Sequence, residues 1–553
     1  MKTMVSNLWQ GLWRSHDQTK NLLNFFSYKK DIDAAKNKKA QSNQATNTGE
    51  PSQQPDTNTK SYSTAQIVGL ILGPLLFVLT LLFFTPEGLS SEARAVLAVT
   101  LWVATWWITE AIPIPVTSLL PIFLMPVTGA LDSNTVTSSY GNDIIFLFLG
   151  GFFIATAMEK WNLHSRIAMA IIAFIGTSTQ RILLGFMVAT AFLSMWVSNT
   201  AAVMMMIPMG LAITAQVASA LKGRPEENEL PKFEKALIFG IGYAGTIGGL
   251  GTLIGTPPNI ILAAQVQELF DIEISFAGWM LIAVPIVVIL TITTWLYLGR
   301  FAFKMSIKGL PGGKEVIQRE RKALGKMIYE EKVVAAVFVF AAFMWITREF
   351  LWINIIPDLK DGMIAVLATA ILFAVPTTKK YGSRILEWKD SKEIPWGVLL
   401  LFGGGLAIAA GFRQTGLSEW IGTQLTVLDG YHILIIITLS TLLVLALTEI
   451  TSNTATATMI LPVLAALALA LHIHPFALMV PAAMAANCAF MLPVGTPPNA
   501  IIFGTGKIRI VEMVRVGFYI NIFALILIVM VVYYLMPIVW GIDLNIVPAE
   551  FYN

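Results

Sequence analysis

Apolar stretches long enough to cross a membrane recur along this chain between Thr64 and Trp540. A bilayer core is about 30 Å thick and a helix rises about 1.5 Å per residue, so one crossing needs about 20 mostly apolar residues. Charged residues make up only 13% of the chain, too few to cover the surface of soluble domains. The sequence therefore predicts an all-α polytopic membrane protein embedded in a lipid bilayer.

Eleven of these stretches fit single crossings, and two do not. The eleven are residues 64–84, 94–109, 112–130, 143–160, 234–267, 276–299, 333–350, 362–378, 395–412, 475–506 and 516–540. Stretches 182–215 and 432–471 are each too long for one crossing, and each carries a polar Ser-Asn-Thr triplet near its middle. We favour re-entrant hairpins for both, although a pair of short crossing helices gives the same topology outside them.

The distribution of basic residues sets the orientation in the membrane. With a cytoplasmic N-terminus, 33 of the 37 Lys and Arg residues fall on the cytoplasmic side, and the C-terminus is extracellular. The hairpin at 182–215 then enters from the cytoplasm, because Arg181 and Lys222 flank it. The hairpin at 432–471 enters from outside, because no Lys or Arg occurs between residues 414 and 506. A multi-pass protein of the plasma membrane is expected.

Two halves of the chain share motifs. Residues 198–208 match residues 452–462 at six of eleven positions, and Gly-Thr-Pro-Pro-Asn occurs at 255–259 and again at 495–499. Because the two hairpins enter from opposite faces, the halves are predicted to be inverted repeats. Many secondary transporters are built from inverted repeats, with the substrate site near the membrane midplane.

This reasoning predicts the domain organisation. The parts are a polar, largely disordered cytoplasmic tail (1–63), a first span (64–92), repeat 1 (93–300, with hairpin 182–215 and broken span 234–267), a basic cytoplasmic linker (301–332), repeat 2 (333–540, with hairpin 432–471 and broken span 475–506) and an extracellular C-terminus (541–553).

Several function classes are disfavoured. A net charge of +3 gives no reason to expect nucleic-acid binding, and a single cysteine, Cys488, excludes an intramolecular disulfide. No phosphate-binding Gly-x-x-x-x-Gly-Lys-Ser/Thr motif occurs, so ATP does not drive this protein. An enzyme would need acid–base or metal-binding groups, and Glu449 is the one ionisable residue near the motifs. We expect no enzymatic activity and no organic cofactor.

The doubled motifs suit a small cation and an anion together. Two prolines in Gly-Thr-Pro-Pro-Asn force the span out of helix and free backbone carbonyls, which must face protein, water or an ion at that depth. With the hydroxyls and amides of Ser-Asn-Thr, each half offers neutral oxygens suited to Na⁺, so at least two ions are expected. The helices after the triplets are expected to begin at Ala201 and Ala455, and helix N-termini favour an anion.

Other patterns have simpler explanations. Residues 240–245 match a dinucleotide-binding fingerprint, but they lie in an apolar span, where small residues are typical of helix packing. His472 and His474 are poor candidates for a metal site. Glu449 occupies the position that corresponds to Met195 in the other repeat, and we favour a hydrogen-bonding role over proton coupling.

The motifs resemble those of the divalent anion/sodium symporter family, which includes the INDY-type di- and tricarboxylate carriers. The resemblance covers residues 64–540 and includes the two Ser-Asn-Thr triplets, the two Gly-Thr-Pro-Pro-Asn segments, and Ile-Thr-Glu-Ala-Ile-Pro-Ile-Pro-Val-Thr at 108–117. It implies eleven spans with two hairpins, a homodimer, and elevator-type movement of the domain that carries the hairpins.

The resemblance also implies site residues. One Na⁺ site would use Ser194, Ser198, Asn199 and the Gly255 carbonyl, and the other would use Thr448, Thr451, Asn453 and the Gly495 carbonyl, with Thr451 acting through its backbone. The substrate carboxylates would be held by Asn199, Thr200, Asn453, Thr454, Thr496 and Pro497. We predict Na⁺-coupled uptake of C4-dicarboxylates such as succinate, fumarate and malate. The alternatives are Na⁺-independent dicarboxylate exchange and carriage of sulfate or citrate.

Overall fold

The computed structural model describes residues 63–176, 178–222, 225–304, 313–378, 382–424 and 430–552. Within these ranges the chain is helical, and the only strand-like pairing is an isolated bridge between Pro376 and Arg384, so the all-α prediction is confirmed. Nearly all of the predicted N-terminal tail and the middle of the basic linker (305–312) lie outside the described residues.

Eight described helices are long and apolar enough to cross a membrane. The main helices of the first half are α3 (Thr64–Phe83), α4 (Ser91–Thr109), α5 (Ile114–Thr117), α6 (Leu120–Thr128), α7 (Ser133–Ser138), α8 (Asp143–Lys160), α9 (Leu163–Ile175), α10 (Thr179–Ser194), α11 (Asn199–Leu221), α12 (Leu230–Gly249), α13 (Pro257–Phe270) and α14 (Phe276–Leu296). Those of the second half are α15 (Gly313–Ala323), α16 (Tyr329–Thr347), α17 (Asp361–Ala374), α18 (Trp396–Gln414), α19 (Leu417–Gln424), α20 (Ile433–Thr448), α21 (Asn453–Ala470), α22 (Phe476–Asn487), α23 (Pro497–Gly504), α24 (Ile510–Met530) and α25 (Met536–Trp540).

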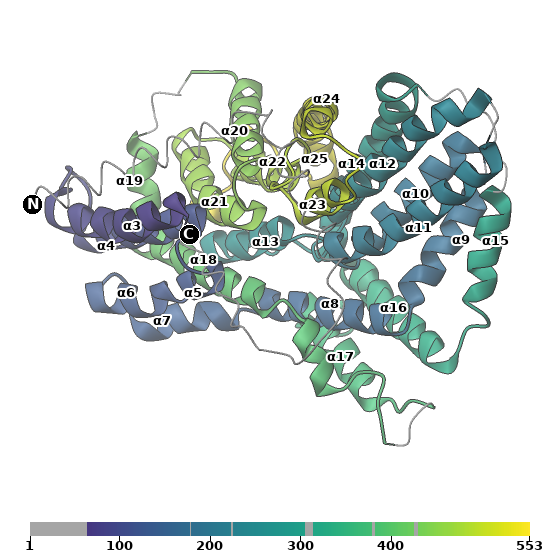
Figure 1. The fold of residues 1–553 in the computed structure, drawn as a ribbon. Helices are drawn as coiled ribbons and strands as arrows, with labels where there is room; N and C mark the ends of the chain where they lie inside the picture. The colour runs from purple at the N-terminus through teal and green to yellow at the C-terminus, as the bar shows by residue number, and fades with distance from the viewer. Residues whose placement is uncertain are drawn as a thin grey trace, which may run out of the picture.

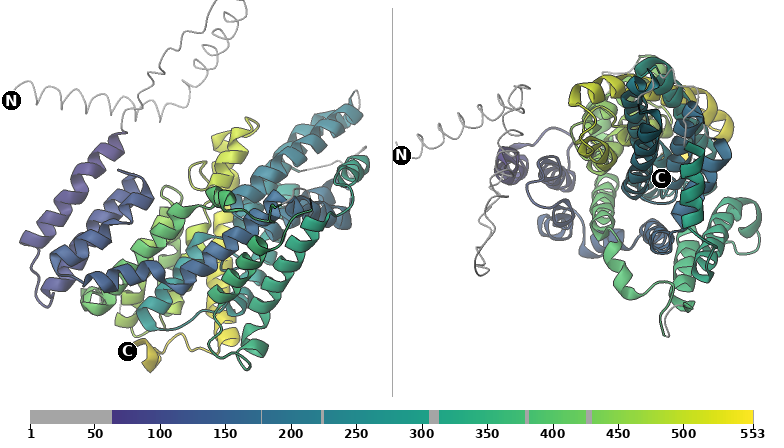
Figure 2. Two further views of the ribbon diagram at one scale, coloured as in Figure 1. Left: turned by 90° about the horizontal axis from the view of Figure 1, so that it is seen from below. Right: turned by 45° about the vertical axis from the view of Figure 1, so that its right-hand side comes forward.

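The helices form an elongated bundle. Figure 1 shows α3 and α4 side by side at one end of the molecule and α9, α10, α11, α12 and α15 at the other, with α13 between them. In both views of Figure 2 the α3–α4 pair lies at the edge, beside the main body. Only 17% of the 18-residue apolar stretch of α3 is buried inside the protein, so most of its apolar surface is left to face lipid.

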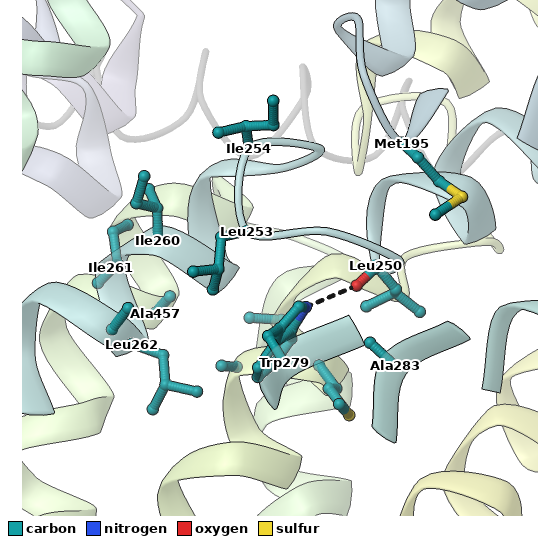
Figure 3. Packing of buried hydrophobic residues seen from close by; sticks show 14 of the residues in the cluster. Met195, Leu250, Leu253, Ile254, Ile260, Ile261, Leu262, Trp279, Ala283 and Ala457 are labelled. Carbon is teal, nitrogen blue, oxygen red and sulfur yellow. Dashed lines mark hydrogen bonds between the residues drawn. The ribbon is translucent and has the colours of Figure 1, made fainter. Parts of the chain in front are cut away.

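The structure interrupts both proline-containing stretches. Helix α12 ends at Gly249 and α13 begins at Pro257, where proline is favoured because the first helical residue needs no amide donor. Trp279 compensates for one lost helical bond, since its indole N–H donates to the Leu250 carbonyl at 2.9 Å (Figure 3). The second stretch breaks in the same way between α22 and α23.

Each Ser-Asn-Thr triplet begins in a four-residue link between two helices, α10 to α11 and α20 to α21. The following helices begin at Asn199 and Asn453, two residues earlier than predicted. The Ser198 hydroxyl accepts the Ala201 amide at 3.2 Å, which is a standard N-cap and allows the earlier start. Ser452 makes no such side-chain cap.

Glycines in α12 allow other helices to approach closely, as the packing interpretation of residues 240–245 predicted. A Cβ at Gly242 would lie 2.6 Å from the Ile502 side chain, and one at Gly240 would lie 2.7 Å from Leu183. A Cβ at Gly249 would lie 2.5 Å from the Asn199 side chain. A methyl group at these positions would require the facing side chain to shift, because distances below 3.0 Å do not accommodate it.

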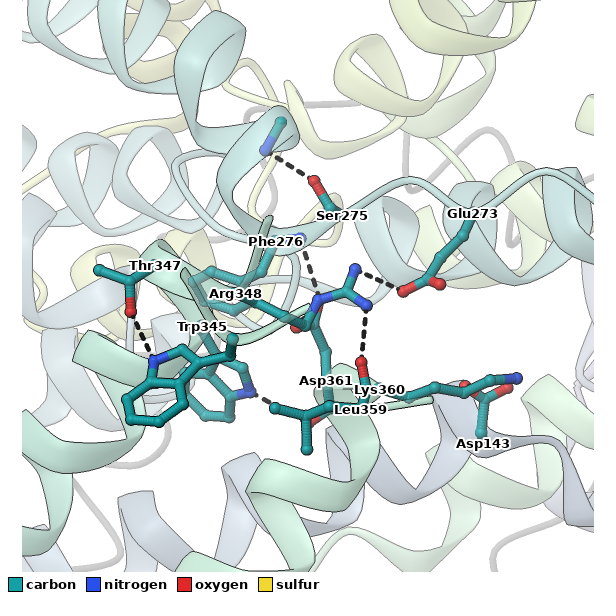
Figure 4. A network of polar contacts seen from close by, with 12 residues as sticks. Asp143, Glu273, Ser275, Phe276, Trp345, Thr347, Arg348, Leu359, Lys360 and Asp361 are labelled. Carbon is teal, nitrogen blue, oxygen red and sulfur yellow. Dashed lines mark hydrogen bonds and ion pairs between the residues drawn. The ribbon is translucent and has the colours of Figure 1, made fainter. Parts of the chain in front are cut away.

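A buried ion-pair network joins the segment before α14 to the ends of α16 and α17 (Figure 4). Arg348 lies 2.7 Å from Glu273 and 2.9 Å from Asp361, and it donates to the Leu359 carbonyl at 3.0 Å. Asp361 also accepts the Phe276 amide at 3.0 Å. The side chains of Arg348 and Asp361 are each only 6% exposed, so each charge depends on the other for compensation.

Candidate functional site

The two pairs of repeated motifs meet at one cavity of about 860 Å³. Its lining includes Ser198, Asn199, Thr200, Gly255, Thr256, Pro257, Thr451, Ser452, Asn453, Thr454, Gly495, Thr496, Pro497 and Pro498. Further lining comes from residues 107–110 at the end of α4, from α8, and from residues 393–398. Repeated motifs separated by 240 and 254 positions in the sequence therefore share one space, which the sequence alone did not establish.

A cluster of oxygen atoms lies behind the first Ser-Asn-Thr triplet. The Ser194 hydroxyl is 2.6 Å from the Gly245 carbonyl and 2.6 Å from the Asn199 side-chain oxygen. That amide oxygen also lies 3.3 Å from the Gly245 carbonyl, and it lies 3.2 Å from the Gly255 carbonyl. An oxygen that faces three other oxygens is unfavourable unless the amide turns its NH₂ group inward or a cation lies among them.

The second triplet has a matching cluster. The Thr448 hydroxyl donates to the Ala486 carbonyl at 2.5 Å and lies 2.6 Å from the Asn453 side-chain oxygen. Ser194 and Thr448 are fully buried and lie outside the cavity lining. The Thr451 hydroxyl donates to the Leu447 carbonyl at 2.7 Å, so it is used within its own helix turn.

The sequence analysis did not predict two members of these clusters, the backbone carbonyls of Gly245 and Ala486. A backbone carbonyl carries no residue-type signal, so only the fold reveals it. The one available clue was position, because each lies nine or ten residues before the glycine of a Gly-Thr-Pro-Pro-Asn segment.

The last residue of each Gly-Thr-Pro-Pro-Asn segment organises the helix break. The side-chain NH₂ group of Asn259 donates to the carbonyls of Gly249, Leu250 and Thr252 at 3.0, 3.2 and 2.8 Å. The side-chain NH₂ group of Asn499 donates to the carbonyls of residues 489 and 492 at 2.9 Å each. Since 489 and 492 are 249 and 252 shifted by 240, the two breaks are folded alike.

The Glu449 carboxylate is hydrogen-bonded by backbone amides of the second helix break. Its carboxylate accepts the amides of Phe490, Met491 and Leu492 at 2.8 to 3.1 Å and the Asn521 side-chain amide at 2.7 Å. At the corresponding place in the first repeat, the Met195 side chain packs against Gly251. The contacts fit the hydrogen-bonding role that we favoured for Glu449.

We expect Glu449→Leu to destabilise the protein strongly, because it leaves three buried amide donors without an acceptor at about 1–3 kcal/mol each. The thermal unfolding temperature of purified protein measures the effect. Met195→Leu at the matched position changes packing only and is expected to shift that temperature little. Equal shifts in the two variants would contradict a special role for the carboxylate.

The histidines lie away from the cavity. Burial lowers the pKa of His474, between α21 and α22, to about 4, and its ring packs against Phe476 and Phe551. Within the described residues, no group of three or more His, Cys, Asp or Glu side chains is placed to hold a metal ion.

Comparison with known proteins identifies the family. A profile described as "Sodium:sulfate symporter transmembrane region" matches residues 64–541. The chain belongs to this family. The resemblance to divalent anion/sodium symporters is therefore confirmed, and the matched region is the one that the motifs marked out.

Curated relatives in this symporter family carry a more specific name. The chain is 59% identical over 490 residues to the sodium-dependent dicarboxylate transporter SdcS of Staphylococcus saprophyticus, covering 88% of this chain and 94% of the relative. It is 58% identical over 491 residues to SdcS of Staphylococcus aureus, with the same coverage.

Solved structures resemble the fold at low sequence identity. The YdaH transporter of Alcanivorax borkumensis matches with a TM-score of 0.54 and 14% identity over 87% of this chain and 98% of its own. MtrF of Neisseria gonorrhoeae, from a class of antimetabolite efflux pumps, matches with a TM-score of 0.52 and 11% identity over 86% and 95%. At this identity the likeness concerns the fold alone.

Proposed function

We propose that this symporter-family protein carries C4-dicarboxylates such as succinate, fumarate and malate into the cell together with Na⁺. The observation that carries the proposal is the single cavity lined by both Ser-Asn-Thr triplets and both Gly-Thr-Pro-Pro-Asn segments. The relatives at 58–59% identity are named sodium-dependent dicarboxylate transporters, which supports both the ion and the substrate class.

Each oxygen cluster fits a Na⁺ ion. The first would use Ser194, Ser198, Asn199 and the Gly255 carbonyl, and the second would use Thr448, Thr451, Asn453 and the Gly495 carbonyl. We add the Gly245 and Ala486 carbonyls, because each accepts the hydroxyl at the centre of its cluster. Unwound backbone and broken helix ends bind Na⁺ in other secondary transporters. The Asn199 amide would turn its oxygen towards a bound cation and its NH₂ group towards the three surrounding oxygens when no ion is present.

The cavity also suits an anion. Four helices begin at its lining, at Asn199, Pro257, Asn453 and Pro497, and helix N-termini favour negative charge. No Lys or Arg of the described chain lines the cavity, so the charge of a dicarboxylate would be balanced mainly by the co-bound ions. The residues that we propose to hold its carboxylates are Asn199, Thr200, Asn453, Thr454, Thr496 and Pro497.

The proposal includes the finer architecture. Eleven crossings, two re-entrant hairpins built from α10–α11 and α20–α21, and the inverted repeats at 93–300 and 333–540 account for helices too short to cross alone. With a cytoplasmic N-terminus, the cavity opens beside α8 and residues 393–395 on the cytoplasmic side. The hairpin-carrying body would move as an elevator against α3–α9 and α16–α19, in a homodimer. No catalytic role is assigned to any residue.

The test is succinate uptake into proteoliposomes with Na⁺ or choline outside. Uptake should depend on Na⁺ and rise more steeply than linearly with its concentration, because at least two ions are expected per substrate. Equal uptake in choline and in Na⁺ would contradict the proposal. Preloading the vesicles with succinate separates symport from Na⁺-independent exchange, since only an exchanger needs internal substrate.

The family name favours one further candidate, carriage of sulfate. Sulfate, citrate and succinate should be offered as competitors in the same assay. Inhibition by sulfate at lower concentration than succinate would move the assignment to sulfate, whereas a preference for succinate supports the dicarboxylate.

A further inference from the structure

The equivalent threonines of the two Gly-Thr-Pro-Pro-Asn segments use their hydroxyls differently. Thr256 and Thr496 precede α13 and α23 with nearly the same backbone, at φ −150°, ψ 145° and φ −142°, ψ 149°. The Thr496 hydroxyl accepts a hydrogen bond from the backbone N–H of Asn499, in the helix that follows it, at 3.3 Å. The Thr256 hydroxyl makes no cap and instead lies 2.8 Å from the side-chain oxygen of Asn487 in the other repeat.

The orientation of Asn487 fixes where the Thr256 proton goes. The Asn487 side-chain NH₂ donates to the Thr246 carbonyl at 2.8 Å, and a carbonyl can only accept. The other end of the amide, facing Thr256, is therefore its oxygen. Asn487 is 1% exposed and Thr256 is 3% exposed, so the Thr256 hydroxyl gives its single proton to Asn487.

The two halves of the cavity consequently offer different chemistry. Thr256 lines the cavity with acceptor capacity only, because its proton is committed. Thr496 already accepts a hydrogen bond and donates to no group of the described chain, so its proton is available. The residue that corresponds to Asn487 at the shift of 240 is Ile247, which has no amide to impose the same constraint.

We propose that Thr256, held as an acceptor by Asn487, binds the hydroxyl of a 2-hydroxy C4-dicarboxylate, while Thr496 donates to a carboxylate. A carboxylate needs donors, and an alcohol needs an acceptor for its proton. Thr256 therefore discriminates malate from succinate, and Asn487 is a positioning residue that acts through Thr256. This inference rests on the proposed function.

The test compares KM for L-malate and succinate in proteoliposomes. Thr256→Val removes the acceptor at nearly constant volume, so the ratio of KM for malate to KM for succinate should rise about two- to tenfold, the worth of one hydrogen bond. Thr256→Ser should keep the wild-type ratio. Thr496→Val, the matched variant, should raise both KM values together and leave the ratio unchanged.

A second variant tests the positioning role. Asn487→Ala should shift the ratio in the same direction, and the Thr256→Val/Asn487→Ala double variant should shift it no further than Thr256→Val alone. If Asn487→Ala does not fold, Thr256→Val decides alone. A wild-type ratio in Thr256→Val, or a change confined to the Na⁺ concentration for half-maximal uptake, overturns the inference. Absence of Na⁺-dependent uptake by the wild type instead overturns the proposed function.

Discussion

Asn199→Ala and Asn453→Ala are each expected to reduce Na⁺-driven uptake to background while protein stays in the membrane. Each side chain lies 2.6 Å from its cluster hydroxyl and also lines the cavity, so its loss would remove a proposed ion contact and a proposed substrate contact together. Contacts with charged groups are worth about 1.5–3 kcal/mol each, so the combined loss is on the order of 100-fold or more.

Uptake normalised to membrane-inserted protein measures this effect. Asn354→Ala is the matched control, because Asn354 is exposed, lies away from the cavity lining, and its side chain donates to the Phe350 carbonyl. The Asn199→Asp variant separates the two lost contacts, since a carboxylate keeps an oxygen for the ion but repels the anion. Uptake near the wild-type level in either alanine variant removes that side chain from the site.

Arg348→Met is expected to give a large loss of stability. Asp361 would keep its hydrogen bond from the Phe276 amide but lose the Arg348 guanidinium, its ionic partner within the described residues, at a position that is 6% exposed. Breaking such a buried pair costs about 3–5 kcal/mol. The thermal unfolding temperature and the yield of folded protein after solubilisation measure the change. Adding Asp361→Asn should recover part of the loss, because it removes the unpaired charge.

A nearby exposed pair provides the control. Lys360 lies 3.8 Å from Asp143, with side chains 42% and 32% exposed, and such pairs contribute about 0–1 kcal/mol. Lys360→Met should therefore barely change the unfolding temperature. If Arg348→Met behaves like Lys360→Met, burial of the Arg348–Asp361 pair does not matter to stability.

Much of the fold followed from local rules. Tandem prolines at 257–258 and 497–498 lack two successive amide donors and are favoured in the first turn of a helix, and they mark where α13 and α23 begin. The helix starts after the triplets were misplaced by two residues. A capping serine at 198 sets the first of these two boundaries, and sequence rules locate such boundaries only approximately.

The site was predicted less completely than the fold. Side chains of the repeated motifs were found because their residue types recur in order. The Gly245 and Ala486 carbonyls, and Asn487, were missed because a carbonyl has no signature in the sequence and Asn487 lies outside the repeated motifs. The role of Asn487 becomes visible only from its contact with Thr256, which lies 231 residues away in the chain.

By itself the sequence determined the class of molecule, the places where helices must break, and the family, because hydropathy and proline chemistry act within about 20 residues. Tertiary structure decided that four separate motifs enclose one space, and that Thr256 and Thr496 differ in which of them can donate. Those outcomes depend on which helices pack together, and packing joins atoms whose separation along the chain leaves no local trace.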